Sequence, residues 1–133
     1  MTARRLTLAA ALLAIGSLAL GLARAGPVQQ ALPDAPSAGA PQACIPRAAI
    51  RDVQVRSDQV IDFELTGGRA YRNTLSAPCP DLAYQARLGY STSTSELCAG
   101  DIVTVLYTSP VQTGARCGLG SFQPVRLPER RRR

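Results

Sequence analysis

The stretch "IDFELTGGRAYRNTL", residues 61–75, places two glycines between two segments with strand character. In the first segment apolar residues alternate with Asp62 and Glu64, the pattern of a strand with one apolar and one wet face. A Gly-Gly pair favours a tight reversal between antiparallel strands, because glycine adopts left-handed backbone conformations without strain. The sequence therefore predicts a β-hairpin here.

The length of the loop decides which side chains share a face of this hairpin. A two-residue Gly67-Gly68 loop would place Phe63 opposite Arg72 and mix the two faces, so we expect a three-residue loop at 67–69. The expected pairs are Leu65 with Tyr71, Ile61 with Leu75 and Glu64 with Arg72. Asn73 then lies on the apolar face, where its amide either bonds to neighbouring groups or forms part of a binding pocket.

The rest of the chain favours further short strands. We expect them within residues 50–79, at 88–92, at 101–108 and at 122–125, with one helical turn around 83–87. The segment 101–108 is apolar on both parities, which predicts a central strand covered on both faces, with Ile102, Val103 and Val105 buried. Five to six short antiparallel strands predict an all-β domain, a small barrel or sandwich of the SH3-like or OB-like type.

Composition divides the chain into four parts. Residues 1–25 combine two early arginines, an apolar run and Ala23-Arg24-Ala25, which predicts a Sec-type signal peptide cleaved after Ala25. Residues 26–43 are rich in proline and alanine and predict a disordered linker. Residues 44–125 form the β domain, and the arginine-rich tail 126–133 is expected to be disordered. We expect a periplasmic or secreted protein with no transmembrane span after cleavage.

The positive charge lies outside the β domain. The formal net charge is +6, but between residues 44 and 125 seven arginines balance seven acidic residues. A neutral domain offers no basic face for specific nucleic-acid binding. The tail is either a solvated segment or a contact for an anionic surface.

Four cysteines, Cys44, Cys79, Cys98 and Cys117, all lie inside the predicted domain. Their spacing lacks the closely paired ligands of a zinc site and the Cys-x-x-Cys of a redox pair, so we expect no metal and two disulfides. A meander favours 44 with 98 and 79 with 117. The alternative, 79 with 98 and 44 with 117, follows if residues 82–94 fold back as a loop.

Catalysis has few candidate groups in this composition. The chain has no histidine and no lysine, which removes the usual bases for a serine or cysteine nucleophile. Asp62 and Glu64 lie about 7 Å apart along a strand face, a spacing that suits a carboxylate-dependent hydrolase. We interpret them instead as solvated or ion-paired, with Arg72 as partner of Glu64. Asp101, after Gly100, is expected to shape the turn before the central strand. No catalytic residue and no cofactor are predicted.

Binding is the function class that remains. Tyr84, Arg87 and Tyr90 are the candidates for an exposed recognition patch, and Asn73 is a further candidate. We expect a binding or structural accessory role in the cell envelope, with an envelope protein or an anionic surface as partner. Inhibition of an envelope or extracellular hydrolase through the loop 91–96 is the alternative.

Several segments also resemble a known family. They are "CIPRAAI", "IDFELTGGRAYRNTL", "CPDL", "LCAGDIVTVL" and "CGLGSFQPV". Together they are similar to a family of small exported proteins of Gram-negative bacteria described as a domain of unknown function. The resemblance covers Cys44 to Val125, including all four cysteines. It implies export and these domain limits, and it brings no catalytic residue.

Overall fold

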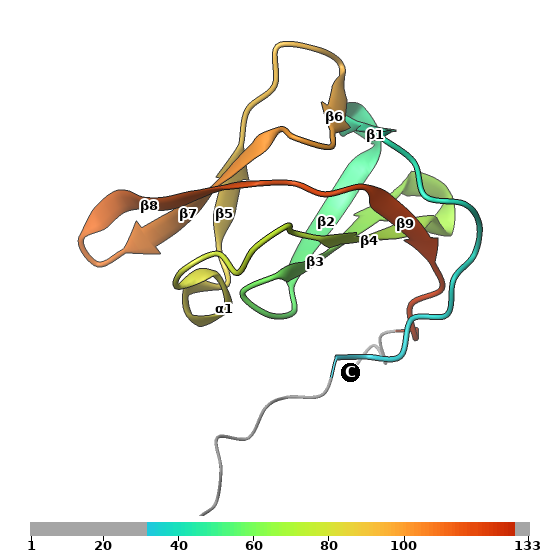
Figure 1. Ribbon diagram of the computed structural model, residues 1–133, viewed down its shortest axis with the longest axis horizontal. Helices are drawn as coiled ribbons and strands as arrows, with labels where there is room; N and C mark the ends of the chain where they lie inside the picture. Colours follow the sequence, from blue (N-terminus) through green and yellow to red (C-terminus); the bar gives the residue numbers. More distant parts are fainter. Residues whose placement is uncertain (1–31, 130–133) are drawn as a thin grey trace, which may run out of the picture. The chain divides into compact units, whose positions relative to one another are not determined.

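A computed structural model describes residues 32–129 of the chain. The predicted signal peptide and the last four arginines lie outside these residues. Within them the fold is all-β, as predicted, and is built from antiparallel sheets that do not close into a barrel (Figure 1). No helix in the described part is long and apolar enough to cross a membrane.

The described residues form nine strands in three sheets. The largest sheet has the order β2 (Ile50–Val55), β3 (Val60–Leu65), β4 (Ala70–Thr74), β9 (Phe122–Val125). The second has the order β5 (Leu88–Tyr90), β7 (Ile102–Thr108), β8 (Val111–Gly118), and the smallest pairs β1 (Cys44–Pro46) with β6 (Glu96–Cys98). The described residues also form a single helical turn, α1 (Leu82–Gln85), and two 3-10 turns, η1 (Arg47–Ala49) and η2 (Thr66–Gly68).

One apolar core draws side chains from all three sheets. Phe63 of β3 and Phe122 of β9 pack edge to face, with ring centroids 5.5 Å apart. Val103 and Val105 of β7 are fully buried in the same core. Burial of each such side chain stabilises the fold by about 1.5–3 kcal/mol. The core therefore holds the inner faces of the sheets together, and the outer faces take no part in it.

The predicted hairpin is present, but its loop lies one residue earlier than expected. Gly67 and Gly68 have φ of 80° and 77°, while Arg69 is extended and accepts a hydrogen bond from Leu65. The observed pairs are Val60 with Thr74, Ile61 with Asn73, Asp62 with Arg72, Phe63 with Tyr71 and Glu64 with Ala70. The predicted pairs are therefore wrong. The predicted faces are right, because the observed register differs from the predicted one by two residues, and an even shift keeps each side chain on its face.

The prediction that the central strand is covered on both faces is wrong. β7 is the middle strand of its sheet, but only its inward side chains, Val103 and Val105, are fully buried. Ile102, on the outer side of this sheet, keeps 38% of its surface exposed. The strand count of five to six is also too low, because β1, β6 and β8 lack a clear alternation of apolar and polar residues.

The two disulfides join Cys44 with Cys98 and Cys79 with Cys117, which confirms the predicted meander pairing. Cys44 and Cys98 are direct register partners of the β1–β6 pair. Cys79 lies before α1 and ties this region to β8. No described cysteine is free.

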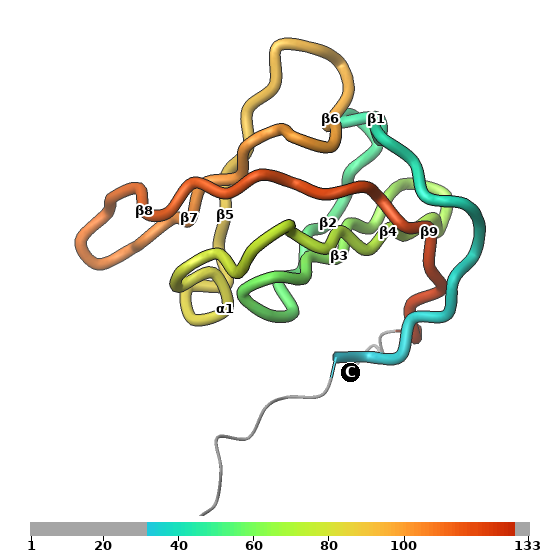
Figure 2. Tube along the Cα trace, viewed as in Figure 1, coloured from blue at the N-terminus to red at the C-terminus, as the bar shows by residue number. Residues whose placement is uncertain are grey.

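The linker prediction is wrong for the segment 33–42, which we call the strap. Figure 2 follows the strap beside β9. Backbone bonds join Ala38 N to Pro124 O and Gln42 N to Phe122 O, each at 2.8 Å, and Arg126 N to Pro36 O at 2.9 Å. β9 is the last strand of its sheet, and an unpaired edge needs partners for its backbone groups. The strap supplies them without needing an apolar core of its own.

Candidate binding face

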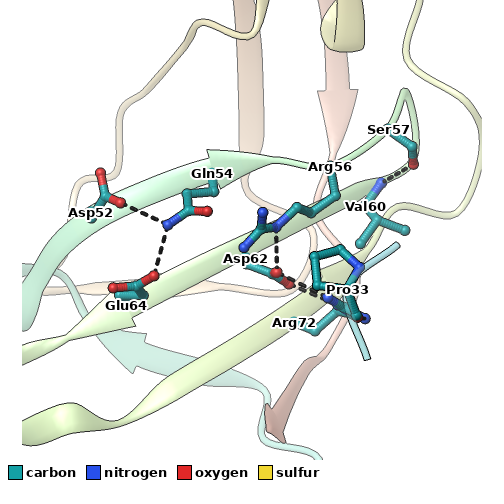
Figure 3. Close-up of polar contacts among 9 residues, drawn as sticks. All are labelled: Pro33, Asp52, Gln54, Arg56, Ser57, Val60, Asp62, Glu64 and Arg72. Carbon is teal, nitrogen blue, oxygen red and sulfur yellow. Dashed lines mark hydrogen bonds and ion pairs between the residues drawn. The ribbon is translucent and has the colours of Figure 1, made fainter. Parts of the chain in front are cut away.

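A polar network covers the outer side of the largest sheet (Figure 3). Asp62 on β3 has no exposed surface, although its strand parity predicts a wet side chain. Arg72 on β4 donates from Nε to Oδ1 at 2.8 Å and from Nη2 to Oδ2 at 3.0 Å, and Arg56 Nε donates to Oδ2 at 2.8 Å. A buried carboxylate requires such pairing, and here two guanidinium groups provide it.

Arg72 also reaches the strap. Its Nη1 donates to the carbonyl of Pro33 at 3.2 Å, so one side chain joins β4, β3 and the strap. The hydrogen bond to Asp62 is the largest effect on this group and raises the pKa of Arg72 above its usual value. The expected partner of Arg72 was Glu64, and this expectation is wrong. Gln54 Nε2 instead bridges Glu64 at 2.8 Å and Asp52 at 3.1 Å.

This geometry bears on the carboxylate pair considered for hydrolysis. A general acid or nucleophile must reach its substrate within hydrogen-bond distance. Asp62 is enclosed by the strands and by Arg56 and Arg72, so it presents no accessible oxygen. Asp62 and Glu64 therefore do not offer two open carboxylates, and the role visible for Asp62 is to hold the sheet and the strap together.

Asn73 is buried and forms a structural contact. Its Nδ2 donates to Gly120 O at 2.7 Å and its Oδ1 accepts from Gly120 N at 2.9 Å. The amide thus pairs with a backbone unit as a neighbouring strand would. A Cβ at Gly120 would lie 2.2 Å from Thr74 O, so this close approach requires glycine. The binding-pocket role considered for Asn73 has no surface to act on.

The three residues considered for an exposed patch separate in the structure. Tyr84 on α1 is 86% exposed, whereas Tyr90 on β5 packs against the core. Arg87, just before β5, is exposed and lies at a different surface, the outer side of the β5–β7–β8 sheet. Of this predicted patch only Arg87 belongs to the site described next.

The outer side of the β5–β7–β8 sheet is open among the described residues, and we call it the β7 face. Its members share outward parity or lie at the strand ends: Arg87, Gly89, Ile102, Thr104, Leu106, Val111, Thr113 and Arg116. Leu106 is half-buried at its centre, and Val111 near the β7–β8 turn is 88% exposed. Single exposed apolar residues are ordinary, but a group of them on one sheet face is typical of an interaction surface.

Two adjoining hollows follow this face. The first, about 320 Å³, is lined by Ile102, Thr104 and Arg116, and the second, about 280 Å³, by Arg87 and Val111. Leu106 and Thr113 line both, so the two hollows adjoin at this pair, and we call them together the groove. Gly89 helps to open it, because a Cβ there would already touch the Leu106 side chain at 3.5 Å.

A larger hollow of about 520 Å³ lies beneath the strap. Its lining includes residues 38–42 of the strap together with Arg69 and Arg126. Much of its lining consists of glycine, alanine and proline residues, which offer few side-chain groups for recognition. The β7 face has the more distinctive chemistry of the two.

The loop 91–96 projects from the sheets between β5 and β6 (Figure 1). Its base is held by the disulfide of Cys98 and by the bond from Arg47 N to Ser95 O at 3.0 Å. Within it, Thr94 Oγ1 donates to Glu96 O at 3.0 Å and accepts from Glu96 N at 3.3 Å. The loop is therefore pre-organised as well as exposed.

The turn before β7 has a structural explanation. Asp101 Oδ2 accepts from Cys98 N at 2.7 Å and Asp101 N donates to Cys98 O at 3.0 Å, around Gly100 at φ 90°. The expected turn-shaping role of Asp101 is confirmed. Cys44, Cys98 and Glu96 come close enough to suggest a metal site, but both sulfurs are already joined to each other.

Sequence reasoning missed most of the β7 face. Ile102 was expected to be buried on a second covered side of β7, and no strand was expected at β8. The sequence gives no signal for which side of β7 is covered, since apolar residues occur at both parities of residues 102–107. Comparisons with protein-family models, with curated proteins and with solved structures found no match. The site therefore rests on its own geometry.

Proposed function

We propose that this chain is an exported β domain that binds a partner protein in the cell envelope, or outside the cell, through the β7 face. The observation that carries the proposal is the open apolar groove, with Leu106 at its centre, on an otherwise well-packed domain. The sequence signal for export and the two disulfides support the compartment, because disulfides persist in oxidising environments. We propose no catalytic activity.

The outer faces of the two larger sheets differ in chemistry, and this difference supports the β7 face as the binding surface. On the largest sheet, polar side chains bond to one another and to the strap, which leaves their donors and acceptors occupied. On the β7 face, the apolar side chains and both arginines face outward with no described ion pair. A partner would remove apolar surface from water there, at about 25 cal/mol per Å².

Affinity capture with matched variants tests the proposal. The tagged full chain, Leu106→Glu and the control Thr74→Glu are each exported and incubated with envelope extract. Thr74 is exposed on β4, away from the groove, so it controls for the added charge. We expect wild type and Thr74→Glu to retain the same discrete partner and Leu106→Glu to lose it.

Retention of the partner by Leu106→Glu, or no partner at all, would contradict the proposal. Ile102→Glu provides a second variant in the same groove, in case one substitution disturbs folding. Equal thermal unfolding midpoints for all variants establish that loss of binding reflects the surface.

Inhibition of a hydrolase through the loop 91–96 is a second candidate function. The pinned base and the internal bonds of Thr94 favour it, because a loop ordered in advance loses less entropy on binding. In this case a captured hydrolase loses activity in proportion to added protein, and Thr94→Ala weakens that inhibition. A hydrolase that keeps full activity when saturated with the protein excludes this role.

A further inference from the structure

The charge of the β5–β7–β8 sheet selects one kind of partner. None of its three strands contains an acidic residue, and no acidic residue lines either hollow of the groove. Arg87 and Arg116 are both exposed, and neither takes part in the ion pairs of Asp62, which are with Arg56 and Arg72. The β7 face is thus cationic at two points and apolar between them.

The strand register places these two arginines diagonally across the face. Arg87 stands opposite Leu106, which pairs with Thr113, and Arg116 pairs with Thr104. Arg87 and Arg116 are therefore separated by two strand spacings across the sheet. The β7 residues opposite them, Leu106 and Thr104, are two positions apart along the strand. With strands about 4.8 Å apart and a rise of about 3.4 Å per residue, their Cα atoms are separated by about 12 Å. Leu106 and Thr104 occupy the middle of this diagonal.

The shape of the groove favours an extended chain over a compact small molecule. A small-molecule site commonly encloses most of its ligand in a concave cavity. Here two shallow hollows of about 320 and 280 Å³ run on from one another across three strands. A peptide in extended conformation lies along such a surface and presents alternate side chains to it.

We infer that the β7 face binds an extended acidic peptide segment of the partner protein, with two carboxylates four residues apart and an apolar side chain midway. This inference rests on the proposed function and specifies its partner. In an extended segment, residues i, i+2 and i+4 face one side and span about 13 Å, close to the separation of the arginines. The carboxylates pair with Arg87 and Arg116, and the apolar side chain covers Leu106.

Titration of the full exported chain with designed peptides tests the inference. The probe is an acetylated peptide with the core Glu-Thr-Leu-Thr-Glu, and the NMR signals followed are the backbone amides and the arginine Nε–H groups. One comparison peptide has the same composition with the two glutamates adjacent, and another has lysine in place of both glutamates. We expect saturable shifts at residues 102–106 and at Arg87 and Arg116 with the first peptide alone.

Variants of the protein make the test specific. Arg87→Ala and Arg116→Ala each weaken binding of the first peptide about two- to fivefold, as expected for an exposed ion pair. Arg47→Ala, an exposed arginine on η1, leaves it unchanged. Binding also weakens as salt rises, since exposed charges are screened over about 8–10 Å.

Several outcomes would overturn the inference. They are equal binding of the lysine peptide or of the adjacent-glutamate peptide, no saturable shift at millimolar peptide, and shifts confined to other surfaces. Binding of anionic lipid vesicles through the same arginines, without peptide binding, would also overturn it. If Leu106→Glu still abolishes capture of a partner while the peptides fail, the proposed function stands and the acidic-peptide inference falls.

Discussion

Asp62 illustrates how the neighbours of a residue decide its role. Strand parity places it on the outer side of β3, and the sequence therefore predicted a solvated or ion-paired surface carboxylate. In the structure Arg56 and Arg72 fold over it and leave it no exposed surface (Figure 3). Parity predicts the face on which a side chain lies, but it cannot predict that long arginine side chains cover that face.

Asp62→Asn is expected to lower the free energy of unfolding by about 2–3 kcal/mol. An amide cannot neutralise two guanidinium groups, and breaking a buried ion pair costs about 3–5 kcal/mol, less here because Arg56 and Arg72 keep 22% and 16% exposure. Urea unfolding of the oxidised protein measures the change. Glu96→Gln, at an exposed position, serves as the control, and equal small losses for both variants would contradict the structural role of Asp62.

Tyr107 gives a prediction about pH. Its hydroxyl donates to Asp81 Oδ2 at 2.5 Å, and this bond raises the pKa of Tyr107 above the ordinary tyrosine value. The bond exists only while the hydroxyl is protonated. Its contribution to stability is therefore present below the ordinary pKa of about 10 and is lost as the pH rises through the raised value.

We expect Asp81→Asn to lower the pKa of Tyr107 toward the ordinary value. NMR titration of ring-labelled tyrosine resolves this group from Tyr71, Tyr84 and Tyr90. Glu96→Gln should leave the Tyr107 titration unchanged. An unchanged titration in Asp81→Asn would mean that the hydrogen bond is absent in solution.

At the scale of elements, the strap is the largest departure from the sequence prediction. Its proline and alanine residues indicated a disordered linker because they cannot form a core. They order instead by pairing with β9, and composition contains no information about an edge strand distant in sequence. Its role depends on the tertiary fold.

Hydrogen exchange tests the strap directly. The amides of Ala38 and Gln42, which bond to Pro124 O and Phe122 O, are expected to exchange slowly. Ala40, midway between these two residues, donates no backbone hydrogen bond among the described residues and should exchange fast. Equally fast exchange at all three amides would restore the disordered-linker interpretation.

The elements that the sequence predicted well have strong local signals. The hairpin of β3 and β4 follows from alternation and two glycines, and β7 follows from its β-branched run. β8 was missed because Gly114 and its polar neighbours give no alternation. A Cβ at Gly114 would lie 2.2 Å from the Tyr107 ring, so a larger residue there would force the ring to move. β8 contributes part of the β7 face, so most of this site could not be predicted from local sequence patterns.

For the whole molecule, the two disulfides hold regions distant in sequence. They close loops with sequence separations of 54 and 38 residues. In the chain-entropy model each such link stabilises the fold by about 4 kcal/mol, comparable with the net stability of a small domain. A domain that depends on such links suits an oxidising compartment, in agreement with the proposed export.

The outer faces of the two larger sheets differ in their chemistry. The β2–β3–β4–β9 face is occupied by its own ion pairs and by the strap, whereas the β7 face stays open with apolar and cationic groups. In the proposed function, a partner protein covers the β7 face.

Site-specific photo-cross-linking in the producing cells tests this claim most directly. A photoreactive residue replaces Thr113 on the β7 face or, in the control, Thr74 on β4, both exposed positions. We expect one discrete adduct from position 113 and none from position 74. No adduct from position 113, or the same adduct from both positions, would contradict it.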